Sequence, residues 1–280
     1  MPNFSTHKPS HYRRGPDHRG GATVGFLEVR KRFDFRSVEI GRWVTDDEKQ
    51  RNAVLFYDAL CDLMTVLGGT EALISLRGSL ALQYGIGGRP GVAAHYTPAT
   101  RSFSLAKNAG PGSIAHEWFH AFDHYISDKL FDSAGIQSAS SGHSARSSQF
   151  GSKRWLMNQT PMPHPLNDLL QACYQAVLLT DGGTEPSELF RQSAKADEAA
   201  GRIYYSQPEE LCARAFEAFV QDSTSCSNNF LVSGTIETDE AKMGLYPRGE
   251  QRMRINDLFG RYFTGLGQAL RANETQKREG

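Results

Sequence analysis

His116-Glu117-Trp118-Phe119-His120 is the stretch that decides the fold of this 280-residue chain. In a helix, residues i and i+4 lie on one face one turn apart, so the two imidazoles can bind one metal ion at about 2.0–2.1 Å. Glu117 directly follows the first histidine, and its carboxylate can approach a water molecule on the metal without being a ligand. The stretch predicts a catalytic zinc site with His116 and His120 as ligands and Glu117 as general base.

The segments before this stretch predict a small sheet. Residues 72–84 are rich in aliphatic and β-branched side chains. Residues 91–96 and 101–105 flank the turn-prone Thr97-Pro98-Ala99-Thr100, which indicates an antiparallel hairpin. The sequence therefore predicts a small twisted sheet with an antiparallel edge strand.

The edge strand is expected to bind substrate. A helix over residues 113–127, with Ser113 as its N-cap, follows the hairpin and carries both histidines. An edge strand beside such a helix can hold an extended peptide through main-chain hydrogen bonds. We therefore expect Ala94, His95 and Tyr96 to form a substrate-binding edge strand.

A catalytic zinc ion takes three protein ligands and keeps one position open. Residues 204–219 supply the best candidate for the third ligand, because Ser206 can cap a helix there and Glu209 completes a capping box with it. Glu210 then lies in the first turn, and the small Ala213 on the same face allows close approach to the histidine-bearing helix. We expect Glu210 to be the third ligand.

Three other side chains are alternatives for the third ligand. Glu217 lies two turns after Glu210 on the same face, where it would pair more naturally with Arg214 or with a histidine near the metal. Cys212 points about 200° away from Glu210 and is expected in the core. His124 would place three ligands on one continuous helix, too spread along its axis for tetrahedral coordination.

Further polar residues are expected to assist the site. Asp123 lies three residues after His120, and it is either a hydrogen-bond acceptor that fixes the tautomer of a ligand imidazole or an ordinary polar residue of the helix. Glu217, like Asp123, is expected to support a metal ligand rather than to bind the metal. Tyr204 or Tyr205 is expected to donate a hydrogen bond to the oxyanion, although either ring could belong to the core instead.

The chain is predicted to form one domain over residues 26–272, between a flexible arm, 1–25, and a charged tail, 273–280. Residues 131–165, rich in Ser and Gly, are expected to be poorly ordered or to act as a lid over the site. Helical periodicity and end signals predict further helices over residues 45–67, 166–180, 187–200, 207–221 and 249–270. The first of these begins with a capping box formed by Thr45 and Glu48.

The composition limits the class of partner and the cellular compartment that we expect. Lys and Arg number 31, as do Asp and Glu, so we expect no membrane partner and no nucleic acid as main partner, although residues 7–42 hold nine basic against four acidic residues. The chain has no bilayer-length apolar run and no secretory signal, so a cytoplasmic location is expected, with signal-free export left open. The four cysteines are far apart, which argues against a disulfide framework and a cysteine zinc site.

Two segments together resemble the gluzincin metallopeptidases, a group that includes the Pro-Pro endopeptidases. They are His116-Glu-Trp-Phe-His-Ala-Phe-Asp123 and Glu210-x-x-Ala-x-Ala-Phe216. The roles that the resemblance implies are zinc ligand for His116, His120 and Glu210, general base for Glu117, and support of a ligand for Asp123. The chain departs from the family pattern at Ile203, which stands where the family has its tyrosine, and at Arg214, which replaces an acidic residue.

Four longer segments resemble the bacterial CLCA-X proteins and the first of the large polyvalent protein-associated domains, which occur in phage and mobile-element proteins. They are Phe35–Val44, Ala93–Tyr96, Ala115–Asp123 and Pro208–Glu217, and the resemblance extends over about residues 30–270. It implies an α+β, zincin-like metallopeptidase fold with a helical C-terminal half, and it implies no particular substrate.

The function that we expect is zinc-dependent hydrolysis of peptide bonds in a peptide or protein substrate, with Zn²⁺ as cofactor. The alternative is a catalytically silent zincin-like module of a phage or mobile-element protein that binds a metal or a partner, with nucleic acid as one such partner. The complete His-Glu-x-x-His stretch favours the enzyme, because a decayed site would lose Glu117 or a histidine. The sequence gives no indication of the oligomeric state.

Overall fold

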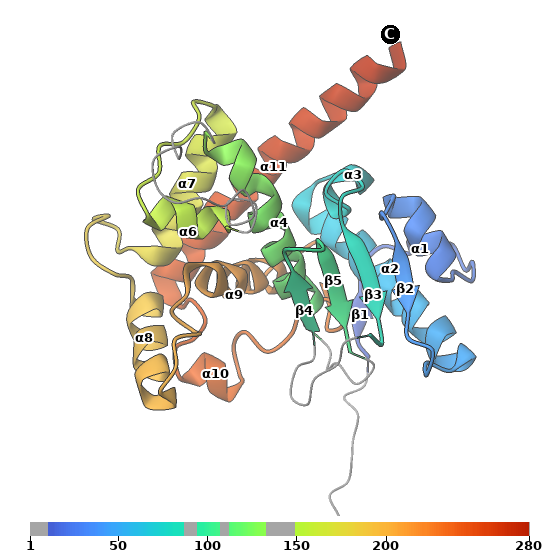
Figure 1. Ribbon diagram of the computed structural model, residues 1–280, viewed down its shortest axis with the longest axis horizontal. Coiled ribbons are helices and arrows are strands. Elements are labelled where there is room, and N and C mark those ends of the chain that lie inside the picture. The colour runs from blue at the N-terminus through green and yellow to red at the C-terminus, as the bar shows by residue number, and fades with distance from the viewer. Residues whose placement is uncertain (1–10, 87–93, 107–111, 133–148, 280) are drawn as a thin grey trace, which may run out of the picture.

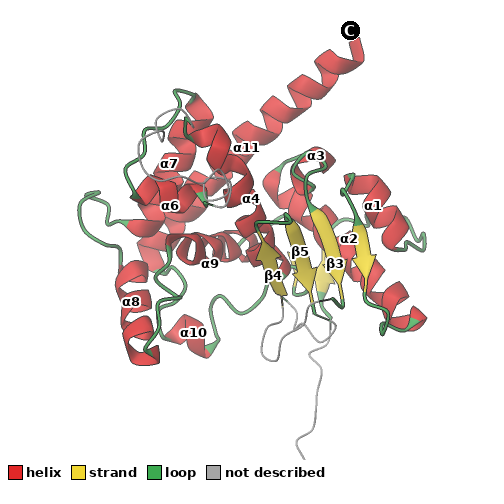
Figure 2. Ribbon diagram, viewed as in Figure 1, coloured by secondary structure: helices red, strands yellow, loops and turns green. Residues whose placement is uncertain are grey.

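The computed structural model describes residues 11–86, 94–106, 112–132 and 149–279. Within these residues the chain is mixed α/β, with a small sheet beside a larger group of helices (Figure 1, Figure 2). The main sheet has the strand order β2-β3-β5-β4. Its strands span Val38–Ile40 (β2), Ala81–Tyr84 (β3), Ala94–Thr97 (β4) and Ser102–Leu105 (β5).

The edge of the main sheet lies next to the helix that carries the histidines. β2, β3 and β5 run parallel, whereas β4 runs antiparallel to β5, with Ala94 opposite Leu105 and Thr97 opposite Ser102. The predicted hairpin is therefore confirmed over these residues. β4 is the edge strand of the described sheet, and it packs against α4, Ile114–Leu130.

The helices follow the predicted periodicity closely. Besides α4, they span Phe26–Phe33 (α1), Asp46–Leu67 (α2), Glu71–Ile74 (α3), Gly151–Leu156 (α6), Pro165–Leu178 (α7), Glu188–Ala200 (α8), Pro208–Gln221 (α9), Asp239–Lys242 (α10) and Gly249–Glu279 (α11). The capping box of α2 is confirmed, because Thr45 Oγ1 accepts from Glu48 N–H while Glu48 accepts from Thr45 N–H. Ser113 stands at the N-cap position of α4 but makes no side-chain cap hydrogen bond.

The histidine-bearing helix is held by an aromatic core. Trp118 stacks on Phe122 in the same helix and on Phe216 of α9, with ring centroids 5.4 and 5.5 Å apart. Its indole N–H donates to the carbonyl of Ile74, 3.0 Å away. Phe263 of α11 packs against the same rings. Each such buried side chain contributes about 1.5–3 kcal/mol, so α4 is fixed relative to α9 and α11.

The prediction of a strand over residues 72–84 is wrong in its first part. Residues 71–74 form the short helix α3, and the strand begins only at Ala81. Leu76 and Arg77 adopt positive φ values of 54° and 57°, and Gly78 follows with 72°. Three successive left-handed residues turn the chain and cannot belong to a strand.

The prediction of a mobile loop or lid over residues 131–165 also needs correction. Residues 133–148 lie outside the described part of the chain, but Gly151–Leu156 forms α6 and Phe131 pairs with Pro161 in an isolated bridge. α6 packs on α4 and α9. A Cβ at Gly151 would lie 2.8 Å from the hydroxyl of Tyr174, so only glycine allows this approach.

The predicted flexible arm is wrong from residue 11 onward. Arg13 and Arg14 form β1, which pairs with β6, Ser227–Asn228, near the other end of the chain. Arg13 also donates twice to the buried carboxylate of Asp62, with both distances 2.7 Å. The N-terminal segment is therefore part of the domain.

The predicted charged tail is helical instead. α11 continues to Glu279, nine residues beyond its predicted end, because residues 271–279 contain neither Gly nor Pro. Its last turns extend away from the rest of the molecule (Figure 1). No helix in the described ranges has both the length and the apolar character needed to cross a membrane.

Candidate metal centre

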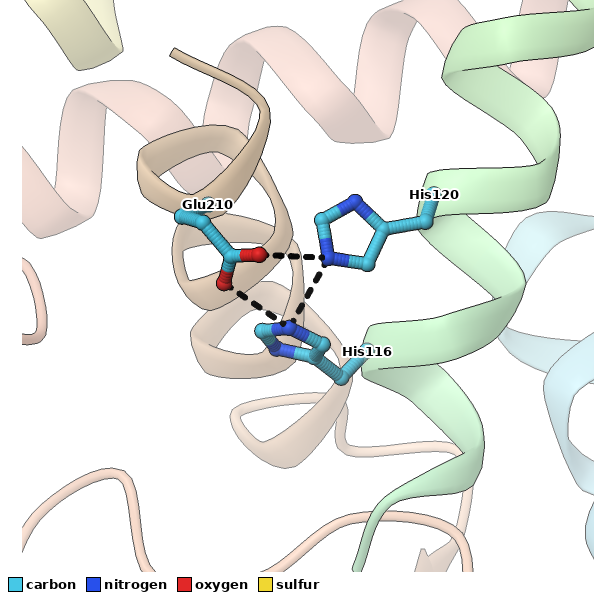
Figure 3. A group of neighbouring side chains, drawn as sticks. All are labelled: His116, His120 and Glu210. Atoms are coloured by element: carbon cyan, nitrogen blue, oxygen red, sulfur yellow. Dashed lines mark hydrogen bonds and ion pairs between the residues drawn. The ribbon is translucent and has the colours of Figure 1, made fainter. Parts of the chain in front are cut away.

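Three side chains from two adjacent helices converge on one point (Figure 3). The Nε2 atoms of His116 and His120, both on α4, lie 3.0 Å apart. Glu210 of α9 places Oε2 3.3 Å from the first nitrogen and Oε1 3.4 Å from the second. Ala213, one turn along α9, is fully buried, and α9 packs against α4.

The separations of these atoms fit a metal ion. Two ligand atoms about 2.0–2.1 Å from a tetrahedral ion lie about 3.3–3.4 Å apart, which matches both distances from Glu210 to the histidines. The 3.0 Å between the two Nε2 atoms is shorter than this. His120 Nδ1 is buried and has no hydrogen-bond partner among the described residues, whereas Glu210 Oε2 contacts only His116. Buried polar atoms normally have partners, so this set of two nitrogens and one carboxylate is well suited to a divalent cation.

Glu217 contacts His116 at the ring nitrogen opposite the one that faces Glu210. Its Oε2 lies 3.0 Å from His116 Nδ1 and also accepts a hydrogen bond of 3.3 Å from the hydroxyl of Tyr246. Burial alone would lower the pKa of His116, but the carboxylates of Glu217 and Glu210 raise it well above its ordinary value. Glu217 thus fixes which nitrogen of His116 faces the centre.

Of the two partners expected for Glu217, a histidine and Arg214, the structure shows the histidine, His116. Arg214 donates to the carbonyls of Tyr205 and Leu245 and to Ser193 Oγ. It lies deep in the protein, and this burial lowers its pKa. Arg214 therefore ties α9 to the segment before it and to residues near α10.

Asp123 does not accept a hydrogen bond from a ligand imidazole, in contrast to the first of its two expected roles. Its carboxylate accepts from Ser152 N–H at 3.0 Å, from Ser152 Oγ at 2.6 Å and from the Tyr174 hydroxyl at 2.6 Å. Burial raises the pKa of Asp123, although these hydrogen bonds oppose the increase. Asp123 anchors α6 and α7 to α4, and Nδ1 of His120 remains without a partner among the described residues.

The capping box predicted at the start of α9 is also wrong. Gln207 occupies the N-cap position without a side-chain hydrogen bond. The hydroxyl of Ser206 instead donates to Asp197 of α8, which also accepts from the backbone N–H groups of residues 204–206. Glu209 has no capping function, and Asp197 fixes the segment that carries the two tyrosines.

The two tyrosines lie differently with respect to the centre. Tyr204 is 40% exposed and lines both of the two adjoining pockets beside His116, His120 and Glu210. Partial burial and the neighbouring Glu210 carboxylate raise its pKa. Tyr205 lines only one side, and the Arg214 guanidinium lies 5.5 Å from its ring centroid. Tyr204 is thus the better placed of the two hydrogen-bond donors.

A cleft with two lobes surrounds the group. The larger lobe has a volume of about 720 Å³ and is lined by Ala94, His95 and Tyr96 of β4, and the smaller has about 430 Å³. His116, Tyr204 and Glu210 line both lobes, as does Glu117. Glu117 is 9% exposed, and it lines both lobes.

The alternative ligands lie elsewhere. His124 Nδ1 is 2.7 Å from the hydroxyl of Tyr96, and the metal-binding group of the described residues does not contain His124. Cys212 is fully buried in the core, as its position on the helix indicated. Sequence reasoning missed Tyr246, which does not stand at a spacing typical of a metal site, and it gave Glu209 a capping role that the structure does not show.

Comparison with known proteins gives one family match. Residues 196–270, about a quarter of the chain, match the model of large polyvalent protein-associated domain 1. The matched segment contains Glu210 and Glu217 but neither His116 nor His120. The predicted resemblance to this domain is confirmed for that segment. Neither the curated proteins nor the solved structures contain a match to the chain.

Proposed function

We propose that the chain is a zinc-dependent metallopeptidase of the zincin type. The observation that carries the proposal is the convergence of His116, His120 and Glu210 within 4.8 Å, with Glu117 lining both lobes. A donor set of two histidines and one glutamate is typical of catalytic zinc in peptidases, because it leaves one coordination position open.

A zinc ion bound here would polarise the scissile carbonyl and acidify the attacking water. Glu117 accepts the proton of that water, since its carboxylate faces the cleft and is not needed as a ligand. The Tyr204 hydroxyl, beside Glu210, donates to the oxygen that gains negative charge. Glu217 and Tyr246 keep His116 in one orientation throughout.

The edge strand supports a peptide as the substrate. β4 has one side paired with β5, and Ala94, His95 and Tyr96 line the larger lobe. An extended peptide can add to such an edge through main-chain hydrogen bonds and pass the metal-binding group. The complete set of ligands and base favours an active enzyme over a module that only binds.

The variant Glu117→Gln tests the proposal. It should retain the metal and the fold but lose about 10²–10⁴-fold in peptide hydrolysis, because the amide cannot accept the proton. Glu198→Gln, which removes the same charge from an exposed position of α8, is the matched control and should keep full activity. Unchanged turnover in Glu117→Gln, measured with a quenched fluorescent peptide library, would refute the assignment.

A further inference from the structure

Glu209, in the larger lobe, has one buried carboxylate oxygen that no described residue contacts. Glu209 is the second residue of α9, is 6% exposed, and lines the lobe beside Glu210. Its Oε2 is buried without a hydrogen bond, and no ion pair to Glu209 exists among the described residues. A buried carboxylate without a partner is costly, so a protein retains one only where something compensates the charge.

Among the described residues, none of the cationic side chains that line this lobe, His95 included, forms an ion pair with Glu209. His116 and His120 face Glu210, as the distances of 3.3 and 3.4 Å show. The guanidinium of Arg202 lies over the ring of Tyr204, 5.7 Å from its centroid, and that side chain is exposed. The α9 N-terminus favours a negative charge by about 0.3–1 kcal/mol at an exposed position and by up to about 2 kcal/mol at a partly buried one. This is less than the several kcal/mol that burial of an unpaired charge costs.

We infer that Glu209 is a specificity-determining residue that selects substrates with a lysine or arginine side chain in the larger lobe. The inference rests on the proposed peptidase function and extends it to a class of substrate. The lobe also suits the rest of such a side chain, because Phe150, Tyr96 and Tyr204 line it with aromatic surface. The methylene stem packs on these rings while the cationic head reaches the carboxylate.

Binding to the Glu117→Gln protein tests this inference without catalysis. The probes are N-acetylated, C-amidated alanine-rich hexapeptides that carry one lysine or one norleucine at each position in turn, so the side chain is the only charge. A charge-assisted hydrogen bond makes the lysine peptide bind about tenfold more tightly, or better, at the position that fills the lobe. Glu209 is not substituted in this protein, so equal affinity for the lysine and norleucine peptides at every position overturns the inference.

The double variant Glu117→Gln/Glu209→Gln assigns the preference to this carboxylate. Titration calorimetry should show that the lysine preference disappears, while zinc content and thermal melting match those of Glu117→Gln. Glu240→Gln is the matched control, because Glu240 is exposed and lines only the smaller lobe. It should keep the preference. A lysine preference that survives Glu209→Gln, or that Glu240→Gln removes, overturns the inference.

Activity separates this inference from the proposed function. Hydrolysis by the unaltered protein without any preference for lysine would overturn the role of Glu209 and leave the peptidase intact. A lysine preference in binding, without hydrolysis of any peptide, would overturn the proposed reaction and leave the cationic subsite intact.

Discussion

At the scale of single residues, the two glutamates of α9 that face α4 have different contacts. Glu210 faces the Nε2 atoms of both histidines, whereas Glu217 contacts only Nδ1 of His116 and the hydroxyl of Tyr246. In the proposed zinc site, the first contact is that expected of a metal ligand and the second that expected of a residue that orients a ligand. Substitution of a ligand lowers metal affinity more than substitution of a residue that supports a ligand, so the two positions should differ in their effect on metal affinity.

Glu210→Gln should weaken zinc binding by more than about 100-fold, because the amide loses the ligand charge. Glu217→Gln should weaken it by about 10–100-fold, the range typical of a group that supports a ligand. Competition with a chromophoric chelator measures both constants. A larger loss of zinc affinity in Glu217→Gln than in Glu210→Gln would show that Glu217 is the ligand and Glu210 the supporting residue.

The limits of sequence reasoning are visible at this scale. The i and i+4 spacing predicted that His116 and His120 converge, because it fixes a helix face. The choice of Glu210 over Glu217 rested partly on a capping box that the structure lacks and on the family resemblance. The partners of Asp123 were not predictable. Ser152 and Tyr174 come from segments 29 and 51 residues away, and only the packing of α6 and α7 on α4 brings them to the carboxylate.

At the scale of elements, helices with clear periodicity and end signals were predicted to within two residues, as α7, α8 and α9 show. Three differences have physical causes. β3 begins late because Leu76 and Arg77 adopt left-handed conformations, which nothing in a run of aliphatic residues indicates. α6 is short and gains its stability from tertiary contacts, and α11 continues because no helix-breaking residue stops it.

The junction of α9 and α11 gives a prediction with a pH dependence. Burial alone would raise the pKa of Asp222, but hydrogen bonds from Arg252 and Asn256 lower it below its ordinary value. A carboxyl whose folded-state pKa is depressed contributes stability above its unfolded pKa of about 3.9 and loses it as the pH falls through the folded value.

Asp222→Asn should therefore lower the free energy of unfolding at pH 7 by up to about 1 kcal/mol, since the pair is partly exposed. The difference from the unaltered protein should shrink below about pH 4. Urea unfolding at several pH values measures it. Asp257→Asn, at an exposed ion pair of α11, is the control and should show little change at any pH. A difference for Asp222→Asn that grows as the pH falls would contradict the account.

At the scale of the whole molecule, the metal-binding group lies between the sheet and the helical half. α4 contacts β4 and β5 and also contacts α6 and α9, so one helix brings together the edge strand and Glu210 (Figure 1). The sequence predicted this arrangement but not the docking of residues 11–25. The pairing of Arg13 with Asn228 joins segments more than 200 residues apart, and no local pattern indicates such a contact.

Metal content is the measurement that tests the central claim most directly. Plasma mass spectrometry of the full chain, reconstituted with zinc and dialysed, should give about one zinc per chain. The double variant His116→Ala/His120→Ala should give none while its circular dichroism stays close to that of the unaltered protein. Full zinc occupancy in the double variant, or no zinc in the unaltered protein, would contradict the account.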